Sequence, residues 1–212
     1  MNPFRRSIRK LYTRFSASSR EKKFKLFSRL FELDDSTLVL DVGFGKRFAH
    51  QYILEDYLPT EVCIIAGEID EQVVRKTASL YPHVLPLVFD GCHLPFRDQS
   101  VDVVYSNAVI EHIGDRAQQK LFADEVGRVG KAWFVTTPNL WFPVDTHTSL
   151  PFVHWLPKRW RLAAFRSVGR RGDLVLLTKG QLQTLFPDSQ VVQLRTTIFP
   201  EVLIAFRTRA SD

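Results

Sequence analysis

Glycine and carboxylate residues gather at the ends of several strand-like runs of this 212-residue chain. The first run continues into Asp41-Val42-Gly43-Phe44-Gly45. Glycines at these two positions favour a tight turn whose backbone approaches a ligand closely, and open parallel sheets bind ligands at the carboxyl ends of their strands. Two glycines alone are a weak motif, so the turn needs support from the polar residues at the same edge of the sheet.

Three later segments supply that support. The second run ends in Gly67-Glu68-Ile69-Asp70, which places Glu68 23 positions after Gly45, where an acid that binds both ribose hydroxyls is expected. Asp70 is the alternative ribose acid, although it is also well placed to cap the following helix. The third run ends in Phe89-Asp90-Gly91-Cys92, and the fourth is followed by Ser106-Asn107-Ala108-Val109. A carboxylate can accept hydrogen bonds from both hydroxyls of a ribose, which agrees with the expected position of Glu68.

Strand-like and helical runs alternate along the part of the chain that must position these residues. The expected strands are residues 37–40, 62–66, 84–89, 101–105, 133–136, 191–194 and 202–206, and the expected helices between them are residues 48–57, 71–80, 115–127 and 179–186. Several strands are apolar on both faces. This alternation predicts an α/β fold with a mainly parallel sheet that is covered by helices on both sides.

Two segments stand outside this alternation. Apolar residues recur at helical spacing in residues 4–15 and again in residues 24–31, with basic residues between them, so we expect a basic amphipathic helical arm over residues 1–35 ahead of a main domain over 36–212. Residues 138–172 form an insertion after the fifth strand that we expect to act as a lid or substrate loop. We expect at least half of six aromatic residues in this region to pack in a core: Trp133, Trp141, Phe142, Phe152, Trp155 and Trp160.

The formal charge of +6 is unevenly distributed. Residues 1–31 carry ten Lys/Arg and one acid, residues 32–150 carry nine Lys/Arg and eighteen acids, and residues 151–212 carry ten Lys/Arg and four acids. An acidic centre therefore lies between two basic ends. Cys63 and Cys92 are far apart without a CxxC motif, so the sequence indicates no disulfide framework and no zinc or other metal site.

The four ordered motifs together resemble the class I S-adenosylmethionine-dependent methyltransferases, most closely the group that includes the ubiquinone and menaquinone biosynthesis enzymes. The resemblance implies a Rossmann-like, seven-stranded, mainly parallel sheet and S-adenosyl-L-methionine as cofactor. It assigns Glu68 to the ribose hydroxyls, Ile69 to the adenine ring and Asn107 to the amino-acid end. The other cofactor residues that it implies are Asp41, Gly43 and Gly45 at the methionine moiety, and Asp90 and Gly91 at the adenine. One departure is Arg47, which stands where the family usually has a third glycine.

Three histidines are candidate general bases. A histidine with a pKa near 6.5 takes a proton from a substrate hydroxyl at neutral pH. His147 lies in the insertion, where Asp145 is placed to orient it, and His154 is a second candidate there. His112 follows the fourth strand, although a structural histidine that packs beneath the pocket is the alternative. His147 is also open to another interpretation, as a lid histidine bonded to backbone.

These observations predict methyl transfer to a small or lipid-like acceptor, which we expect to be anionic or membrane-associated because basic, aromatic-rich segments flank the acidic domain. We therefore expect a cytoplasmic protein with peripheral contact to an anionic membrane. RNA methylation is a less favoured alternative, because Ser106-Asn107-Ala108-Val109 replaces the Pro-Pro-aromatic motif of many nucleic-acid enzymes. A non-catalytic partner protein with the same fold is the third alternative. The sequence does not specify the oligomeric state.

Overall fold

A central sheet of seven strands organises the chain in a computed structural model that describes residues 3–44, 54–145, 148, 150–169 and 173–209. The strands are β1 (Leu38–Val42), β2 (Cys63–Glu68), β3 (Val84–Val88), β4 (Val101–Asn107), β5 (Gly130–Pro138), β6 (Gln190–Leu194) and β7 (Val202–Arg207). The helices are α1 (Pro3–Leu30), α2 (Glu71–Ala78), α3 (Arg116–Val129), α4 (Lys158–Ser167) and α5 (Lys179–Leu185), with 3-10 turns η1 (Leu54–Asp56), η2 (Ile110–His112) and η3 (Val153–Trp155).

The strand order is β3-β2-β1-β4-β5-β7-β6. Strands β1 to β5 run parallel, whereas β7 pairs antiparallel with both β5 and β6. The order reverses between β1 and β4, which is the position at which open α/β sheets bind ligands. The predicted mainly parallel α/β sheet of seven strands is therefore confirmed, and each expected strand is present.

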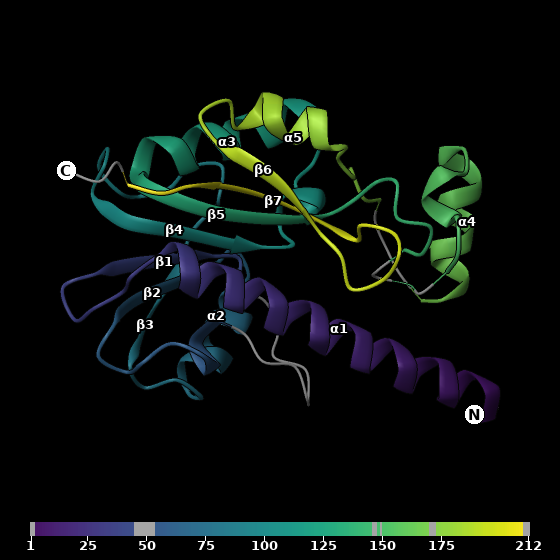
Figure 1. The fold of residues 1–212 in the computed structure, drawn as a ribbon, viewed down its shortest axis with the longest axis horizontal. Coiled ribbons are helices and arrows are strands. Elements are labelled where there is room, and N and C mark those ends of the chain that lie inside the picture. The colour runs from purple at the N-terminus through teal and green to yellow at the C-terminus, as the bar shows by residue number, and fades with distance from the viewer. Residues whose placement is uncertain (1–2, 45–53, 146–147, 149, 170–172, 210–212) are drawn as a thin grey trace.

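Helices cover both faces of the sheet (Figure 1). One apolar cluster lies on the side of α1 and α2 and includes Phe27, Ile64 and Phe134. A second cluster lies on the opposite side and includes Phe122 of α3 and Leu182 of α5. Strands β1, β4, β5 and β7 are thus largely buried on both faces, as their continuous apolar runs predict, whereas the edge strand β3 is mostly exposed.

The two expected N-terminal helical stretches form one continuous helix, α1. Its last turns pack on the sheet, because the Phe27 ring lies 5.2 Å from the Tyr105 ring and 5.4 Å from the Phe134 ring. Its earlier turns extend past the carboxyl edge of the sheet (Figure 1). The predicted boundary at residue 35 stays a prediction, although the C-terminal part of the helix shares the main core.

The insertion after β5 has a small core of its own, formed by Val153, Phe165, Leu174 and Leu176. The expectation for its aromatic residues was wrong. Trp133 and Phe142 are buried, whereas the other four are exposed: Trp141, Phe152, Trp155 and Trp160. The small core has room for few large rings, so most of them lie on the surface.

Among the helices of the described residues, none has both the length and the apolar character needed to cross a bilayer.

Candidate functional site

A cleft of about 260 Å³ opens at the carboxyl edge of the sheet, beside the ends of β1, β2 and β3. Parallel strands bring their carboxyl ends to one edge, so residues that are distant in sequence meet there. Six of the predicted site residues line this cleft: Gly43, Glu68, Ile69, Asp90, Gly91 and His112. Gly45 and His147 lie outside the described residues, as does Arg47.

Gly43 forms the turn that follows β1. Its φ of 79° lies in the left-handed region, and its N–H donates a 2.8 Å hydrogen bond to the carbonyl of Gly67 at the end of β2. A Cβ atom at this position would lie 2.4 Å from Cγ2 of Val109. Glycine is therefore required by both the backbone conformation and the space, and bare backbone forms this wall of the cleft.

Glu68 and Asp70 have different roles, which separates the two candidate ribose acids. Asp70 Oδ1 accepts a 3.0 Å hydrogen bond from the N–H of Gln72 at the start of α2, and it does not line the cleft. Glu68 lines the cleft, half-buried, and its Oε1 accepts from the N–H of Ile69 at 2.9 Å. The Ile69 side chain beside it is 66% exposed, so an apolar surface adjoins a carboxylate that accepts hydrogen bonds.

Asp90 lies in the cleft wall with its carboxylate partly engaged. Oδ1 accepts from the N–H of Cys92 at 2.9 Å, and Oδ2 lies 3.3 Å from Nδ1 of His93. The Cys92 amide holds the pKa of Asp90 below its usual value, so the side chain is ionised at neutral pH. These contacts are those of an acid that holds a turn, while its place in the lining of the cleft also keeps Asp90 within the candidate ligand site.

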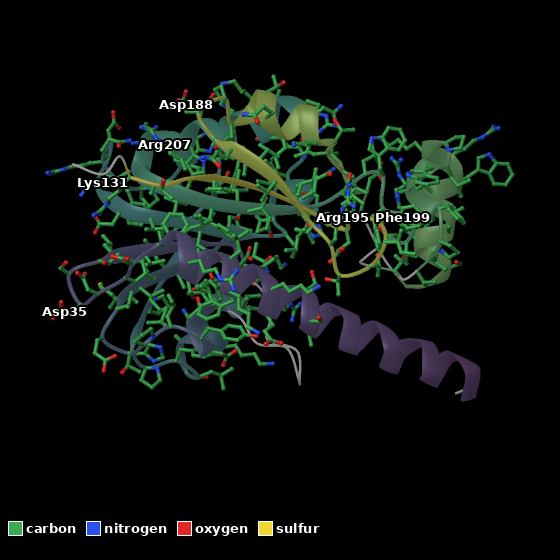
Figure 2. All side chains as sticks on the ribbon, viewed as in Figure 1. Asp35, Lys131, Asp188, Arg195, Phe199 and Arg207 are labelled. Atoms are coloured by element: carbon green, nitrogen blue, oxygen red, sulfur yellow. The ribbon has the colours of Figure 1, made fainter. Side chains whose placement is uncertain are left out.

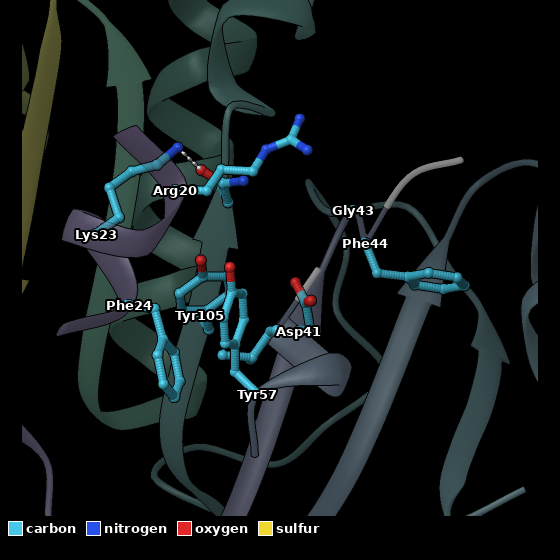
Figure 3. Close-up of a pocket in the computed structure, with 10 residues that line it drawn as sticks. Arg20, Lys23, Phe24, Asp41, Gly43, Phe44, Tyr57 and Tyr105 are labelled. Carbon is cyan, nitrogen blue, oxygen red and sulfur yellow. Dashed lines mark hydrogen bonds between the residues drawn. The ribbon is translucent and has the colours of Figure 1, made fainter. Parts of the chain in front are cut away.

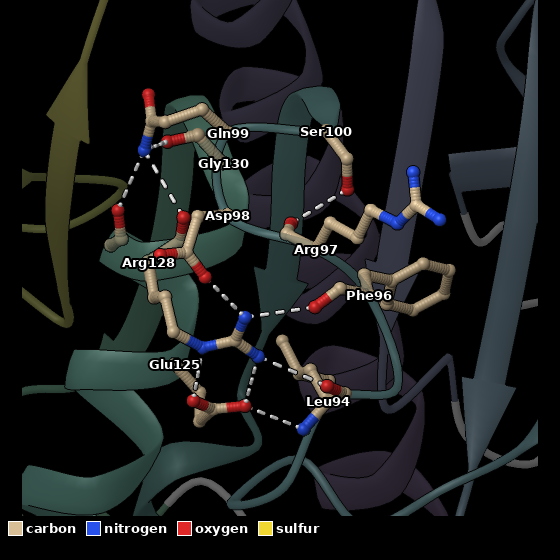
Figure 4. Close-up of polar contacts among 10 residues, drawn as sticks. Leu94, Phe96, Arg97, Asp98, Gln99, Ser100, Glu125, Arg128 and Gly130 are labelled. Atoms are coloured by element: carbon tan, nitrogen blue, oxygen red, sulfur yellow. Dashed lines mark hydrogen bonds and ion pairs between the residues drawn. The ribbon is translucent and has the colours of Figure 1, made fainter.

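Arg128 of α3 fixes the segment that follows this turn (Figure 4). Its guanidinium donates to the carbonyls of Phe96 at 2.8 Å and Leu94 at 3.1 Å, and Nε donates to Glu125 at 2.6 Å. Glu125 in turn accepts from the N–H of Leu94 at 2.7 Å. The connection from β3 to β4 is therefore anchored to α3, which holds the adjacent cleft wall in place.

A second, smaller hollow of about 30 Å³ lies on the other side of Gly43 and is covered by α1 (Figure 3). Two predicted cofactor residues, Asp41 and Asn107, line it rather than the larger cleft. Gly43 lines both spaces, so they adjoin at the glycine turn. The residues expected to contact the ribose and adenine therefore line the cleft, whereas Asp41 and Asn107, expected near the methionine and amino-acid end, line this hollow.

Asp41 is buried at the end of β1. Its Oδ1 atom has no hydrogen-bond partner within the described part of the chain. Burial raises the pKa of Asp41 well above its usual value, and the nearby carboxyl of Glu55 raises it further. Burial likewise raises the pKa of Glu55 to about 7. An unpaired buried carboxyl oxygen is costly, so a positively charged ligand group at this position would stabilise it.

Lys23 of α1 is a member of this hollow that motif reasoning missed. It is 7% exposed, and its Nζ donates to Oδ1 of Asn107 at 2.5 Å, while Thr136 Oγ1 donates to the same oxygen at 2.8 Å. Burial, and secondarily the charge of Arg20, lower the pKa of Lys23 to about 7. Helical spacing could have predicted the burial of Lys23, because position 23 precedes the apolar Phe27 by four residues and lies on the same face of the helix.

The candidate bases occupy different environments. His112 is exposed on the cleft wall, so the alternative in which it packs beneath the pocket does not hold, whereas its neighbour Glu111 is buried. Asp145, expected to orient His147, is buried and accepts from both the N–H and the hydroxyl of Thr148 at 2.7 Å. His154 is buried within the insertion, and burial lowers its pKa, so it is a neutral side chain away from the cleft.

Comparison with known sequences finds one family match and several partial relatives. Residues 40–132 match a family model described as a methyltransferase domain. A Mycolicibacterium smegmatis protein named "Probable S-adenosylmethionine-dependent methyltransferase" is 34% identical over 101 residues, which is 48% of this chain and 38% of that protein. A Mycobacterium tuberculosis protein of the same description is 39% identical over 108 residues, covering 48% of this chain and 35% of the relative. The chain thus spans little more than a third of these relatives.

Comparison with solved structures supports the fold. A methyltransferase from Aquifex aeolicus has a TM-score of 0.58 at 15% identity, with 97% of each chain covered. A Haemonchus contortus phosphoethanolamine N-methyltransferase, solved in complex with S-adenosyl-L-methionine, has a TM-score of 0.57 at 15% identity, covering 82% of this chain and 38% of that chain. The Rossmann-like sheet predicted from the sequence is therefore the fold of this protein.

Proposed function

We propose that this chain is a class I S-adenosylmethionine-dependent methyltransferase acting on a small or lipid-like acceptor. One observation carries the proposal: the glycine turn, Glu68 and Ile69 line one cleft at the point where strand order reverses. These residues fall within the segment that matches the methyltransferase-domain model. That segment is less than half of the chain, so the assignment of a cofactor site rests mainly on the residues that line the cleft.

The residues of the cleft suit this cofactor. Glu68 offers a carboxylate to the ribose hydroxyls, and the exposed Ile69 side chain offers an apolar surface to the adenine ring. Asp90 and Gly91 form the adjoining wall. On the other side of Gly43, the unpartnered Oδ1 of Asp41 suits the ammonium group of the amino-acid end, and Asn107 adjoins it.

When bound, the cofactor supplies a methyl group already activated by a sulfonium. The protein then has to align the acceptor, exclude water and accommodate a proton. We propose that α1 does the excluding, because it covers the polar hollow beside Gly43. For the proton, His112 stands on the cleft wall, and His147 is the second proposed base.

For the acceptor, we propose a compound of the kind handled by the ubiquinone and menaquinone biosynthesis group, with a long apolar part or an anionic group. The support is chemical: exposed aromatic side chains and exposed basic residues such as Lys158 and Arg159 lie toward the carboxyl edge of the sheet. They suit an amphiphilic molecule better than a free small polar one.

Calorimetry with S-adenosylhomocysteine tests the cofactor assignment. We expect the wild type to bind it and Glu68→Ala to weaken binding by about tenfold or more, because each hydrogen bond to a charged group contributes about 1.5–3 kcal/mol. Glu71→Ala is the matched control, since Glu71 is an exposed acid on α2 that pairs with Arg75 outside the cleft. Absence of wild-type binding, or equal affinity of Glu68→Ala and wild type, would refute the proposal.

A further inference from the structure

Three large aromatic side chains form an exposed cluster on the insertion. The Trp141 and Phe152 rings both lie beside the Trp155 ring, at centroid distances of 6.3 and 5.2 Å. The cluster is firmly held, because Nε1 of Trp155 donates a 2.7 Å hydrogen bond to the carbonyl of Leu140. Trp141 is nevertheless 63% exposed. Exposed aromatic rings on a fixed backbone are uncommon unless they contact a partner or a membrane.

The connection between β6 and β7 presents a second apolar group nearby. Ile198 is 87% exposed, and Phe199 beside it is also exposed (Figure 2). This connection is joined to the segment that enters the insertion, because Nδ2 of Asn139 donates to the carbonyl of Pro200 at 2.9 Å. It is also joined to α1, because Lys22 donates to the carbonyl of Arg195 at 2.9 Å. The first contact joins the two apolar groups, and the second ties the β6–β7 connection to α1.

Helix α4 adds positive charge to the same end of the molecule (Figure 1). Lys158, Arg159 and Arg166 are exposed, and the Arg159 guanidinium lies 5.5 Å from the ring centre of Trp160, which is 59% exposed. Residues 146–172 contain no acid, and the first 20 residues of the chain contain six basic residues and no acid. These two segments therefore carry only positive charges, and Asp173, the acid that follows residues 146–172, is paired with Arg161 of α4.

We propose that this end of the molecule docks onto an anionic lipid surface. The docking patch consists of Trp141, Phe152, Trp155, Trp160, Ile198 and Phe199, with Lys158 and Arg159 beside it. This inference rests on the proposed function, because the lipid-like acceptor proposed above would be taken from that membrane.

The chemistry of the docking patch favours lipid over other occupants. Aromatic and branched aliphatic side chains enter the interfacial region of a bilayer, and lysine and arginine are attracted to anionic headgroups. The patch also lies at the carboxyl edge of the sheet, since Pro138 at the end of β5 pairs with Val202 just after the β6–β7 connection. A membrane bound there faces the edge at which the candidate cleft opens.

Vesicle flotation tests the proposal with the full chain. The probe is a phosphatidylcholine vesicle containing about 30 mol% phosphatidylglycerol, compared with phosphatidylcholine alone. We expect the protein to float with the anionic vesicles and much less with the neutral ones. Lys158→Gln combined with Arg159→Gln should lower the partition coefficient about 25-fold, or about fivefold per charge. The matched control is Lys76→Gln combined with Arg97→Gln, which removes two exposed charges outside the patch.

A second pair of variants tests the apolar part. Ile198→Ser combined with Phe199→Ser should lower partitioning about tenfold or more, because the apolar side chains no longer leave water on binding. Leu85→Ser combined with Leu87→Ser is the control, since both leucines are exposed on β3 at the far side of the sheet. Circular dichroism and S-adenosylhomocysteine calorimetry on each variant establish that the fold and the cofactor site are intact.

Several outcomes would overturn the proposal. It fails if wild-type protein floats no better with anionic vesicles than with neutral ones, or if the control pairs lose as much binding as the patch variants. It also fails if light scattering shows a dimer that Ile198→Ser with Phe199→Ser converts to a monomer, or if a single-stranded RNA oligonucleotide binds the basic residues while vesicles do not. Flotation without S-adenosylhomocysteine binding would refute the proposed function and leave the docking patch standing.

Discussion

Replacing Lys23 by methionine should stabilise the fold at neutral pH and remove part of its pH dependence. In the folded protein burial lowers the pKa of this amine from 10.5 to about 7. The charged residues that act on it are Arg20, which lowers its pKa, and Glu111 and Glu201, which raise it. The unfolded chain therefore binds more protons than the folded chain between these two pKa values, so stability rises with pH in that window.

The magnitude follows from the shift. The pKa of Lys23 in the unfolded chain is 10.5. Burying the amine therefore lowers the free energy of unfolding by about 4 kcal/mol near neutral pH and by about 2 kcal/mol two pH units higher. Lys23→Met removes that cost but also the hydrogen bond to Asn107, which contributes about 1 kcal/mol. Asn107 keeps its bond from Thr136. The net expectation is a gain of about 3 kcal/mol near neutral pH, shrinking as pH rises.

Urea unfolding followed by tryptophan fluorescence measures this difference at both pH values. The quantity of interest is the variant minus the wild type, because contributions from other titrating groups then cancel. Lys22→Met is the control, since Lys22 is the exposed neighbour on the same helix and should leave the pH slope unchanged. If Lys23→Met and the wild type change in parallel with pH, Lys23 is not held in a desolvating environment and the reasoning is wrong.

Four further substitutions test other parts of the structure. Gly43→Ala forces a side chain into a left-handed backbone conformation against Val109, so it should lower the free energy of unfolding by about 1–3 kcal/mol and weaken S-adenosylhomocysteine binding. Gly127→Ala on α3 is the contrasting variant, because a Cβ atom there meets no atom within 4 Å. It should raise the melting temperature. The raised pKa of Glu55 means that the folded protein binds more protons than the unfolded chain between pH 4.5 and about 7, so the wild type loses stability as pH rises through this range. Glu55→Gln should make this loss smaller. Equal pH profiles of variant and wild type would contradict the buried position of Glu55. Asp115→Ala removes the hydrogen bonds to the first turn of α3 and should cost about 1 kcal/mol in chemical unfolding, and an unchanged midpoint would argue against the cap.

Periodicity and motif spacing were sufficient for most of the architecture. Buried parallel strands show continuous apolar runs and helices an amphipathic repeat, so each strand was found. Two features differed from the expectations, one for a local reason and one because of packing. Two helical stretches became one helix because nothing between residues 15 and 24 breaks it, and most aromatic residues of the insertion lie on the surface because its small core has room for few of them.

The sequence by itself determined which residues meet at the carboxyl edge of the sheet. Gly43, Glu68 and Asp90 each follow a strand, and parallel strands bring such residues to one edge whatever packs around them. Only the tertiary structure decided that this edge holds a cleft and a smaller hollow, and that α1 covers the hollow. Lys23 reaches Asn107 across 84 positions because α1 lies over the sheet, and no local pattern encodes that contact. The docking patch has the same origin, since its two apolar groups are joined by the hydrogen bond of Asn139 to Pro200, between segments that are separate in the sequence.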